Sequence, residues 1–461
     1  MASTVLTWDP GSGSVTNKWT YSVWCKRGQI NGLPQSLVSS SNTTSSYTEI
    51  TFNADDTFIF YNSDGGFASG KLKTTAQYKD CTSWYHFCVV WDPTNVTATD
   101  RIKIYVNGVE PAFTDDDAPS TGQNSTIGNT YAHHIGGYDT NYDQSANSQY
   151  FVGYMAQSIM VNGYALAPTV FGSFDGDTGE WKPKGDATIR SAVTWSGNCW
   201  LIPFSNSSYL GYDYQTSDRS GTTNDFTVVG SGYQAQDNPS NNFCVWNSLD
   251  NYFGNNTFTY GNTVITQNSS YKTYNIGTLG MANKGKYYWE SMLTVDSNSN
   301  FVAGIQGKYS FSTTDYPADH ENSSMIDGAG GIFANGVDTG DYGSGYTTSS
   351  ILSVAYDALN NFVYYGKDGT WLNSGDPTSG ASGTGGFDPG AAGIDTVLAA
   401  YLPCWGANFT FVGGVKTNFG DGYFAGVNIT SAGTNAAGLG RFEYDVPTGY
   451  TALCTKGMNS F

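Results

Sequence analysis

Short runs of alternating hydrophobic and polar residues recur along the first part of the chain and end at turn-forming residues. The clearest runs cover residues 19–26, 57–61, 84–91, 101–106 and 150–161. Two of them end at Asn-Gly pairs, Asn107–Gly108 and Asn162–Gly163. Such pairs favour tight hairpins because both residues tolerate positive φ. Short strands in this rhythm, with no helical periodicity between them, predict a sandwich of two antiparallel sheets.

The pattern breaks after residues 181–185 and resumes in the second half. Residues 186–250 are rich in Ser, Asn and Tyr and are too long for a structureless loop within one domain. Further strand-like runs cover residues 286–295, 301–305, 351–356, 362–365, 398–402 and 408–412, with a Gly-rich loop at 374–386. We therefore predict an all-β chain of two antiparallel β-sandwich domains in tandem, residues 1–185 and 251–461. Residues 186–250 are predicted to be a connector packed on these modules.

The composition supports strands and limits the partners. Charged residues make up only 13% of the 461 positions, while Gly occurs 57 times, Tyr 33 times and Phe 25 times. The net charge of -19 predicts repulsion from nucleic acid and from anionic lipid headgroups. The sequence has neither an apolar run long enough for a membrane helix nor the N-terminal pattern of a secretory signal. We therefore expect no nucleic-acid partner and no membrane insertion.

The seven cysteines are an odd number and are scattered along the chain. They are Cys25, Cys81, Cys88, Cys199, Cys244, Cys404 and Cys454. None forms a C-x-x-C pair, which excludes the common zinc and dithiol redox motifs. The scatter indicates buried free thiols in a protein assembled in a reducing compartment. Cys81 and Cys88 flank a predicted strand, so a disulfide between them stays open at this point.

Several segments of the first domain carry a family pattern. Residues 84–92, 100–109 and 135–137 together resemble the laminin G-like, concanavalin A-like lectin/glucanase superfamily, which implies a jelly-roll sandwich. Residues 151–156, 162–168, 171–172 and 179–183 are similar to modules of marine bacteriophage structural and tail-fibre proteins. Laminin G-like modules usually begin with one or two extra strands before the Trp-containing strand. In this chain, residues 5–8 lead almost directly into that strand. The resemblance therefore implies a shorter first sheet, or one that a neighbouring chain completes at an assembly contact.

The second domain has its own family pattern. Residues 285–290 resemble the opening strand of a SPRY domain, and residues 354–357 with 362–366 resemble its central hairpin. Residues 418–420 and 442–453 resemble its closing segment. A laminin G-like half followed by a SPRY-like half again resembles phage virion proteins.

The superfamily includes glycan hydrolases, so catalytic residues are the next question. Retaining β-glucan hydrolases of this fold use a Glu-x-Asp-x-x-Glu strand, whose two carboxylates lie ~5 Å apart. The six glutamates, Glu49, Glu110, Glu180, Glu290, Glu321 and Glu443, do not form this pattern. His133 and His134 are adjacent, so on a strand their rings point to opposite faces, and His86 is interpreted as structural. With no serine elbow or phosphate-binding loop, the sequence predicts no enzymatic activity.

Two kinds of binding site have candidate residues. No cofactor is expected; the alternative is Ca²⁺, with oxygens from Asp115, Asp116 and Asp117. Consecutive strand residues cannot converge on one ion, so this site would need a loop geometry. Glycan binding would use exposed aromatic rings beside hydrogen-bonding groups. The candidates are Tyr138, Asp139 and Tyr142 in the first domain, and Tyr342, Tyr346 and Trp371 in the second; the alternative for each ring is simple packing.

These observations and the resemblance lead to one main hypothesis. The protein is expected to be a phage virion surface component, namely a tail fibre, head fibre or capsid decoration, that serves particle architecture, host-surface adhesion or both. Other virion proteins, further copies of the chain and a host-surface glycan are the expected partners. The expected location is the virion surface, after assembly in the host cytoplasm. A free carbohydrate-binding lectin is the alternative, and a glycan hydrolase is the third reading.

Overall fold

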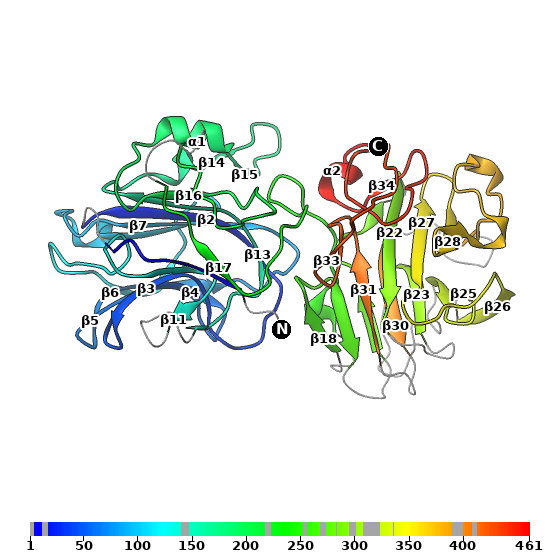
Figure 1. Cartoon of the computed structure of the whole chain (residues 1–461), viewed down its shortest axis with the longest axis horizontal. Helices are drawn as coiled ribbons and strands as arrows, with labels where there is room; N and C mark the ends of the chain where they lie inside the picture. The colour runs from blue at the N-terminus through cyan, green and yellow to red at the C-terminus, as the bar shows by residue number, and fades with distance from the viewer. Residues whose placement is uncertain are drawn as a thin grey trace. The chain divides into compact units, whose positions relative to one another are not determined.

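The computed structural model describes residues 4–11, 17–139, 147–216, 223–251, 256–267, 273–282, 284–294, 301–307, 323–334, 336–389, 400–407 and 413–461. The chain forms two compact units. Unit 1 contains Met1–Gln234 and Asn238–Ser240, and unit 2 contains Ala235–Asp237 and Asn241–Phe461. Both units consist of stacked β-sheets with little helix (Figure 1), which confirms the predicted all-β fold with two antiparallel sandwiches.

Unit 1 is a sandwich of two antiparallel sheets. Within the described residues, its larger sheet has eight strands, in spatial order β17 (Thr227–Val229), β1 (Val5–Trp8), β10 (His133–Ile135), β3 (Gln35–Thr43), β4 (Ser46–Phe52), β5 (Thr57–Asp64), β6 (Phe67–Gln77) and β9 (Phe113–Asp117). The smaller sheet contains β16 (Trp200–Ile202), β13 (Gly153–Asn162), β2 (Trp19–Arg27), β7 (Tyr85–Trp91) and β8 (Ile102–Val106). The remaining elements are the hairpins β11 (Tyr138–Asp139) with β12 (Asn147–Ser148) and β14 (Gly172–Phe174) with β15 (Trp181–Pro183), and the helices η1 (Ala98–Asp100), η2 (Pro168–Val170) and α1 (Asp186–Ala192).

Aromatic side chains fill the space between the two sheets of unit 1. The ring centroid of Trp19 on β2 lies 5.9 Å from that of Phe60 on β5, and Phe58 stacks on Phe87 at 4.0 Å. The buried Trp19 Nε1 donates a hydrogen bond to Ser125 Oγ at 2.8 Å. Each fully buried large apolar side chain contributes roughly 1.5–3 kcal/mol. The large residues that alternate in the sequence are therefore the ones that join the two layers.

Residues 186–250, predicted as a connector packed on the modules, are built into the units themselves. β16 extends the smaller sheet beside β13, and β17 pairs with β1. Residues 241–250 belong to unit 2. Since β1 also pairs with β10 on its other side, the first strand has partners on both edges within the chain. This pairing counts against the expectation that a neighbouring chain completes the sheet.

Two local predictions are confirmed. All seven cysteines are buried free thiols, so Cys81 and Cys88 do not form a disulfide. The turn at Asn107 and Gly108 has φ values of 49° and 78°, as the Asn-Gly pair predicts. A Cβ on Gly108 would also lie 2.5 Å from the Trp181 ring, so the close approach of that ring requires glycine as well.

Unit 2 is a second sandwich. Among its described residues, one sheet contains β18 (Asn256–Thr259), β19 (Val264–Gln267), β31 (Gly414–Asn418), β22 (Lys286–Leu293), β27 (Ile351–Asp357), β28 (Phe362–Lys367) and β29 (Thr370–Trp371), with β34 (Thr451–Ala452) beside β22. The other contains β20 (Thr273–Ile276), β30 (Ala400–Ala407), β23 (Phe301–Gly307), β24 (Ser323–Asp327), β25 (Gly331–Ala334) and β26 (Val337–Asp341), with β21 (Met281–Ala282) beside β30. The short elements are β32 (Tyr423–Phe424), β33 (Val427–Asn428), η3 (Ser248–Asp250), η5 (Leu372–Ser374), η6 (Gly380–Ser382) and α2 (Thr455–Met458).

The strands predicted in the second half correspond to observed ones. Residues 286–295, 301–305, 351–356 and 362–365 fall on β22, β23, β27 and β28, and residues 398–402 overlap β30. The predicted strand at residues 408–412 lies outside the described residues. Trp289, Val354, Phe301 and Trp405 from the two sheets are buried in one core cluster.

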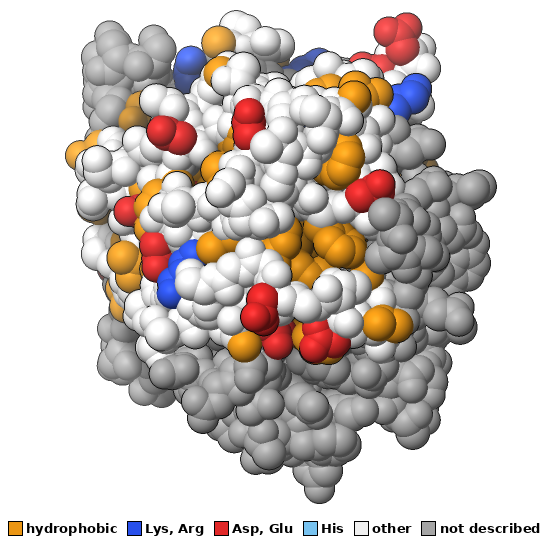
Figure 2. Space-filling model, turned by 90° about the vertical axis from the view of Figure 1, so that its right-hand side faces the viewer, with side chains coloured by type: hydrophobic (Ala, Val, Ile, Leu, Met, Phe, Trp, Pro, Cys, Tyr) orange, Lys and Arg blue, Asp and Glu red, His pale blue; other side chains and the backbone are white. Residues whose placement is uncertain are grey.

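The surface has few positive groups. Figure 2 shows one face of the molecule, on which acidic side chains are scattered among hydrophobic and neutral ones while Lys and Arg appear in few places. This agrees with a net charge of -19. None of the helices in the described part of the chain is long and apolar enough to cross a membrane.

Candidate functional site

The larger sheet of unit 1 turns a row of polar side chains away from the core. Residues paired on neighbouring strands point to the same side of a sheet. The register therefore joins one row from β1 to β9, which contains Thr7, His134, Ser39, Glu49, Tyr61, Lys71 and Asp117. The adjacent positions Ile50, Phe60 and Leu72 point the other way, into the core. We call the side that carries the polar row the outer face.

Three tyrosines meet on the outer face and form what we call the tyrosine cluster. The ring centroids of Tyr47 on β4 and Tyr61 on β5 lie 5.7 Å apart, and Tyr138 on β11 meets Tyr47 edge-on at 5.5 Å. Tyr47 and Tyr61 are half-buried, whereas Tyr138 is only 9% exposed. Partly exposed rings held in a fixed position offer an apolar surface bordered by polar groups, which is the usual composition of a small-molecule site.

Ion pairs lie beside the tyrosine cluster. Lys71 Nζ lies 2.8 Å from Asp115 Oδ2, and Lys73 Nζ lies 2.8 Å from Asp55 Oδ2. The Lys71 ammonium holds the pKa of the Asp115 carboxyl below its ordinary value, and Lys73 lowers the pKa of Asp55 to about 2. Asp117 is exposed and opposite Lys71 in the register. The outer face thus offers aromatic rings next to groups that accept and donate hydrogen bonds.

Glu49 lies next to Tyr61 in the row and is 7% exposed. Its carboxyl group lies beside the hydroxyls of Ser36 and Thr51, whose hydrogen bonds partly offset the effect of burial on its pKa. Ser36 lies on β3 beside β4, and its backbone N–H donates to the Gln149 carbonyl oxygen at 2.8 Å. Burial raises the pKa of Glu49 to about 7. A carboxyl group with a pKa near neutrality can act in acid–base chemistry or bind a proton-dependent partner.

The geometry around Glu49 does not fit a paired-carboxylate hydrolase. The next carboxylate along the row, Asp117, lies three strands away through β5, β6 and β9. At ~4.8 Å between neighbouring strands, the two backbones are about 14 Å apart. Glycosidases hold their two carboxyl groups roughly 5–9.5 Å apart.

Substitution of Glu49 by Gln is expected to change the pH dependence of unit 1 stability. The pKa of this group is raised from 4.5 to about 7 on folding, so its stabilising contribution is full below pH 4.5 and is lost as the pH rises through 7. Gln stays neutral, so the variant should exceed the wild type in unfolding free energy at pH 8 by up to about 3 kcal/mol and match it near pH 4.5. Urea denaturation at several pH values measures this. Glu180→Gln, at a carboxyl that is 67% exposed, is the control, and equal pH profiles for wild type and Glu49→Gln would contradict the expectation.

One predicted ligand residue of the first domain, Tyr138, joins the tyrosine cluster. Asp139 lies on β11, but its side chain is outside the described part of the chain, as is the whole of Tyr142. Tyr47 and Tyr61 were missed by the sequence reasoning. Their signal is the alternation on β4 and β5, which places them on the side opposite Ile50 and Phe60. The alternation becomes informative only once the pairing of the strands is known.

The candidates of the second domain are packed against the protein, which corrects the expectation of exposed rings. Tyr342 and Tyr346 are 8% and 5% exposed and belong to the core of unit 2. Their hydroxyls donate to the carbonyl oxygens of Gly385 and Gly366. Trp371 is half-buried and packs in a different cluster, where its ring meets Tyr288 edge-on at 6.3 Å. The three rings do not form a common surface.

The predicted Ca²⁺ ligands need a second correction. Asp115, Asp116 and Asp117 lie on strand β9 and not in a loop, so Asp116 points to the side opposite the other two. Asp115 is also paired with Lys71. Elsewhere in the described residues, no group of three or more His, Cys, Asp or Glu side chains is arranged to hold a metal ion.

The histidine interpretation is confirmed for His86. This ring is fully buried, its Nε2 lies 2.8 Å from Ser22 Oγ, and its Nδ1 accepts a hydrogen bond from Trp181 Nε1 at 3.1 Å. Burial lowers the pKa of His86 to about 3, so the ring is neutral and joins the sheet to the β14–β15 hairpin.

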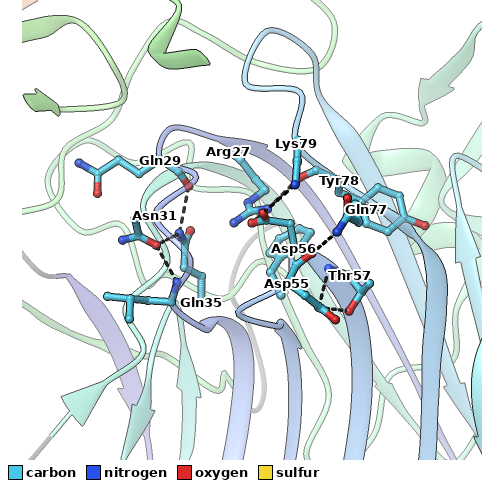
Figure 3. A network of polar contacts seen from close by, with 12 residues as sticks. Arg27, Gln29, Asn31, Gln35, Asp55, Asp56, Thr57, Gln77, Tyr78 and Lys79 are labelled. Carbon is cyan, nitrogen blue, oxygen red and sulfur yellow. Dashed lines mark hydrogen bonds and ion pairs between the residues drawn. The ribbon is translucent and has the colours of Figure 1, made fainter. Parts of the chain in front are cut away.

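A second polar network closes one end of the unit 1 sandwich (Figure 3). Arg27 Nη1 donates to Asp56 Oδ1 at 2.9 Å and to the Tyr78 carbonyl oxygen at 2.7 Å, and its guanidinium lies 4.4 Å above the Phe52 ring. Lys79 approaches the other carboxylate oxygen of Asp56 at 3.7 Å. The Arg27 side chain has no exposed surface. We call this set the Arg27 clamp, because it ties the end of β2 to the β4–β5 turn and to the segment after β6.

Comparison with known proteins gives one family match. Residues 2–167 match the model Laminin_G_3, described as the concanavalin A-like lectin/glucanases superfamily. The match contains every strand that forms the outer face except β17. No curated protein matches the sequence.

Solved structures give weaker likenesses. The SPRY domain of human HERC1 is 17% identical, with 33% of this chain and 86% of that chain covered and a TM-score of 0.26. A heptameric SAP-like pentraxin from Limulus polyphemus is 14% identical over 36% of this chain and 72% of that chain, with a TM-score of 0.28. A human SPRY domain is 13% identical over 35% and 94%, with a TM-score of 0.25. All three scores are below 0.5 and carry no argument about function. The family match thus stands by itself: residues 2–167 are similar to the concanavalin A-like lectin/glucanases superfamily, as their sequence pattern predicts.

Proposed function

We propose that the protein is a non-enzymatic adhesion component of a bacteriophage virion surface, and that unit 1 contacts a host-surface glycan at the tyrosine cluster. The observation that supports glycan contact is the set of Tyr47, Tyr61 and Tyr138 on one sheet face beside hydrogen-bonding carboxylates. The phage assignment rests on the sequence resemblance to phage tail-fibre and structural modules. A tail fibre, a head fibre and a capsid decoration all fit this role.

The physical case for glycan contact rests on rigidity. The two strands that carry Tyr47 and Tyr61 are paired with each other and also with β3 and β6 on their outer sides. Rings on a fully paired sheet lose little conformational freedom when a ligand binds. The C–H face of a pyranose ring can lie on such a tyrosine, while the sugar hydroxyls donate to the carboxylates of Asp115 and Asp117.

Substitution of Tyr61 by Ala is expected to weaken binding of the cognate glycan about tenfold, because one aromatic contact is worth roughly 1 kcal/mol or more. A glycan array identifies the ligand, and titration calorimetry measures the affinity of both proteins. Tyr164→Ala is the matched control, since Tyr164 is 43% exposed and lies outside the outer face. A ligand whose affinity falls equally in both variants would place the contact elsewhere.

The proposal includes other virion proteins and further copies of the chain as partners, with assembly in the host cytoplasm before display on the particle. Seven buried free thiols are compatible with a reducing compartment. Quantitative mass spectrometry of purified particles, with immunogold labelling, tests this part. A fixed copy number per particle supports it, and absence from particles refutes it.

A free carbohydrate-binding lectin is the second candidate, and the tyrosine cluster favours it equally. The two functions differ in where the protein is found. Tyr61-dependent glycan binding by a protein that is absent from particles would identify the lectin.

A further inference from the structure

The positive charges on the outer face are already occupied by carboxylates. Among the described residues of this face, the cations are Lys71 and Lys73, and their side chains are 26% and 21% exposed. Each ammonium lies 2.8 Å from a carboxylate oxygen, Lys71 from Asp115 and Lys73 from Asp55. An anionic ligand would therefore gain little from either lysine, because a carboxylate already balances each ammonium charge.

The same face carries more negative than positive groups. Asp117 is exposed next to the Lys71–Asp115 pair. Two lysines thus face three aspartates, Asp55, Asp115 and Asp117, on or beside the row that holds the tyrosine cluster. The whole chain has a net charge of -19, so the long-range field also repels anions.

The carboxylates of the outer face can accept hydrogen bonds from the hydroxyl groups of a ligand. Asp115 is 46% exposed at its side chain, and an ionised carboxylate accepts hydrogen bonds from several donors at once. Sugar hydroxyls supply such donors, and an O–H···O⁻ bond is about twice as strong as a neutral one. An uncharged sugar can therefore bind here without electrostatic repulsion, whereas the aspartates on this face repel a uronate or a sulfate ester.

We infer that the outer face of unit 1 selects uncharged polysaccharide and rejects acidic polysaccharide, through the tyrosine cluster and the occupied Lys71 and Lys73. This inference rests on the proposed glycan adhesion and adds the chemical class of the ligand. The specificity comes from the ion pairs, since the tyrosine rings would stack on charged and uncharged sugars alike.

Matched polysaccharides test the inference. Affinity electrophoresis of the full chain uses dextran, mannan and galactan, each beside its carboxymethylated derivative. At least one neutral polymer is expected to retard the protein in a Tyr61-dependent manner. Its carboxymethylated form should bind at least tenfold more weakly at low ionic strength.

Substitution of Asp115 by Ala removes the nearest carboxylate partner of Lys71 and should reduce the preference for the neutral over the carboxymethylated polymer to threefold or less. Asp175→Ala is the matched control, because it removes the 2.9 Å carboxylate partner of Lys182 on the β14–β15 hairpin, outside the outer face, and leaves Glu180 at 3.9 Å. This control variant should leave the preference for the neutral over the carboxymethylated polymer unchanged.

Three outcomes overturn the inference, and they differ in what they say about the proposed function. If the carboxymethylated polymers bind with equal or higher affinity in a Tyr61-dependent manner, the ligand is not limited to uncharged polysaccharide. The proposed glycan adhesion is then still supported. If Asp115→Ala and Asp175→Ala change the preference for neutral polymers equally, the ion pairs of the outer face do not determine the specificity. The proposed glycan adhesion is then still supported. Absence of Tyr61-dependent binding to every neutral and acidic polymer refutes both together.

Discussion

Replacing Asp56 by Asn is expected to lower the free energy of unfolding of unit 1 by about 3 kcal/mol, because it leaves the buried Arg27 charge without its counter-ion. The Arg27 side chain has no exposed surface and that of Asp56 is only 7% exposed, so water cannot replace the lost carboxylate. Asn suits the left-handed backbone at position 56, where φ is 64°, and it keeps a side-chain oxygen for Arg27. The decrease in unfolding free energy therefore reflects the lost negative charge and not backbone strain.

Calorimetry of the full chain measures this loss, and peptide-resolved hydrogen exchange assigns it to unit 1. Glu110→Ala is the control, since the Lys103–Glu110 pair is partly exposed and is worth ~0–1 kcal/mol. The double variant Arg27→Met/Asp56→Asn should recover much of the loss, because it removes both buried charges. Equal small effects of Asp56→Asn and Glu110→Ala would show that the Arg27 clamp does not stabilise the fold.

The fold was predictable because hydrophobic alternation decides which side of a strand is buried. The run at residues 19–26 correctly predicted β2, whose Trp19 and Tyr21 are fully buried. The Asn-Gly pair at 107–108 correctly predicted the observed turn. The incorporation of residues 186–250 into both units was harder to foresee. β16 and β17 are only three residues long, and each is held by a partner that is distant in the sequence, β13 or β1. Such strands have too little local pattern to be recognised.

The candidate site depended on information that is absent from the linear pattern. Tyr138 was identified because it follows Gly137 in an aromatic loop, but its neighbours Tyr47 and Tyr61 come from strands far away in the sequence. Glu49 appeared as one of six scattered glutamates, and only the register places it beside Tyr61. Tyr342 and Tyr346 were candidates for exposed rings, whereas both are buried in the core and their hydroxyls donate to the carbonyl oxygens of Gly385 and Gly366.

Unit 2 contains a buried carboxylate with a structural role. Glu290 on β22 is fully buried and accepts hydrogen bonds from the backbone N–H groups of Glu443 and Tyr444, at 2.8 and 2.9 Å, and from the Tyr288 hydroxyl at 2.9 Å. Asn418, on the neighbouring β31, donates to the Arg441 carbonyl oxygen at 2.8 Å. The residues of the SPRY-like closing segment are thus attached to the sheet by side chains of two adjacent strands.

Substitution of Glu290 by Ala is expected to lower the free energy of unfolding of unit 2 by about 4 kcal/mol, because it removes the acceptor of two backbone N–H groups, at roughly 1–3 kcal/mol each. The Tyr288 hydroxyl keeps Ser353 Oγ as an acceptor at 3.1 Å. Calorimetry measures the loss, and hydrogen exchange should show the backbone amides of Glu443 and Tyr444 among the first to lose protection. Glu290→Gln keeps the shape and one oxygen acceptor, so it should cost less than the alanine variant. Burial raises the pKa of Glu290 from 4.5 to about 7, so its contribution to stability is full below pH 4.5 and falls as the pH rises through 7. The gap between wild type and Glu290→Gln should therefore narrow at higher pH, and a gap that widens would show that the carboxyl is held ionised by its donors.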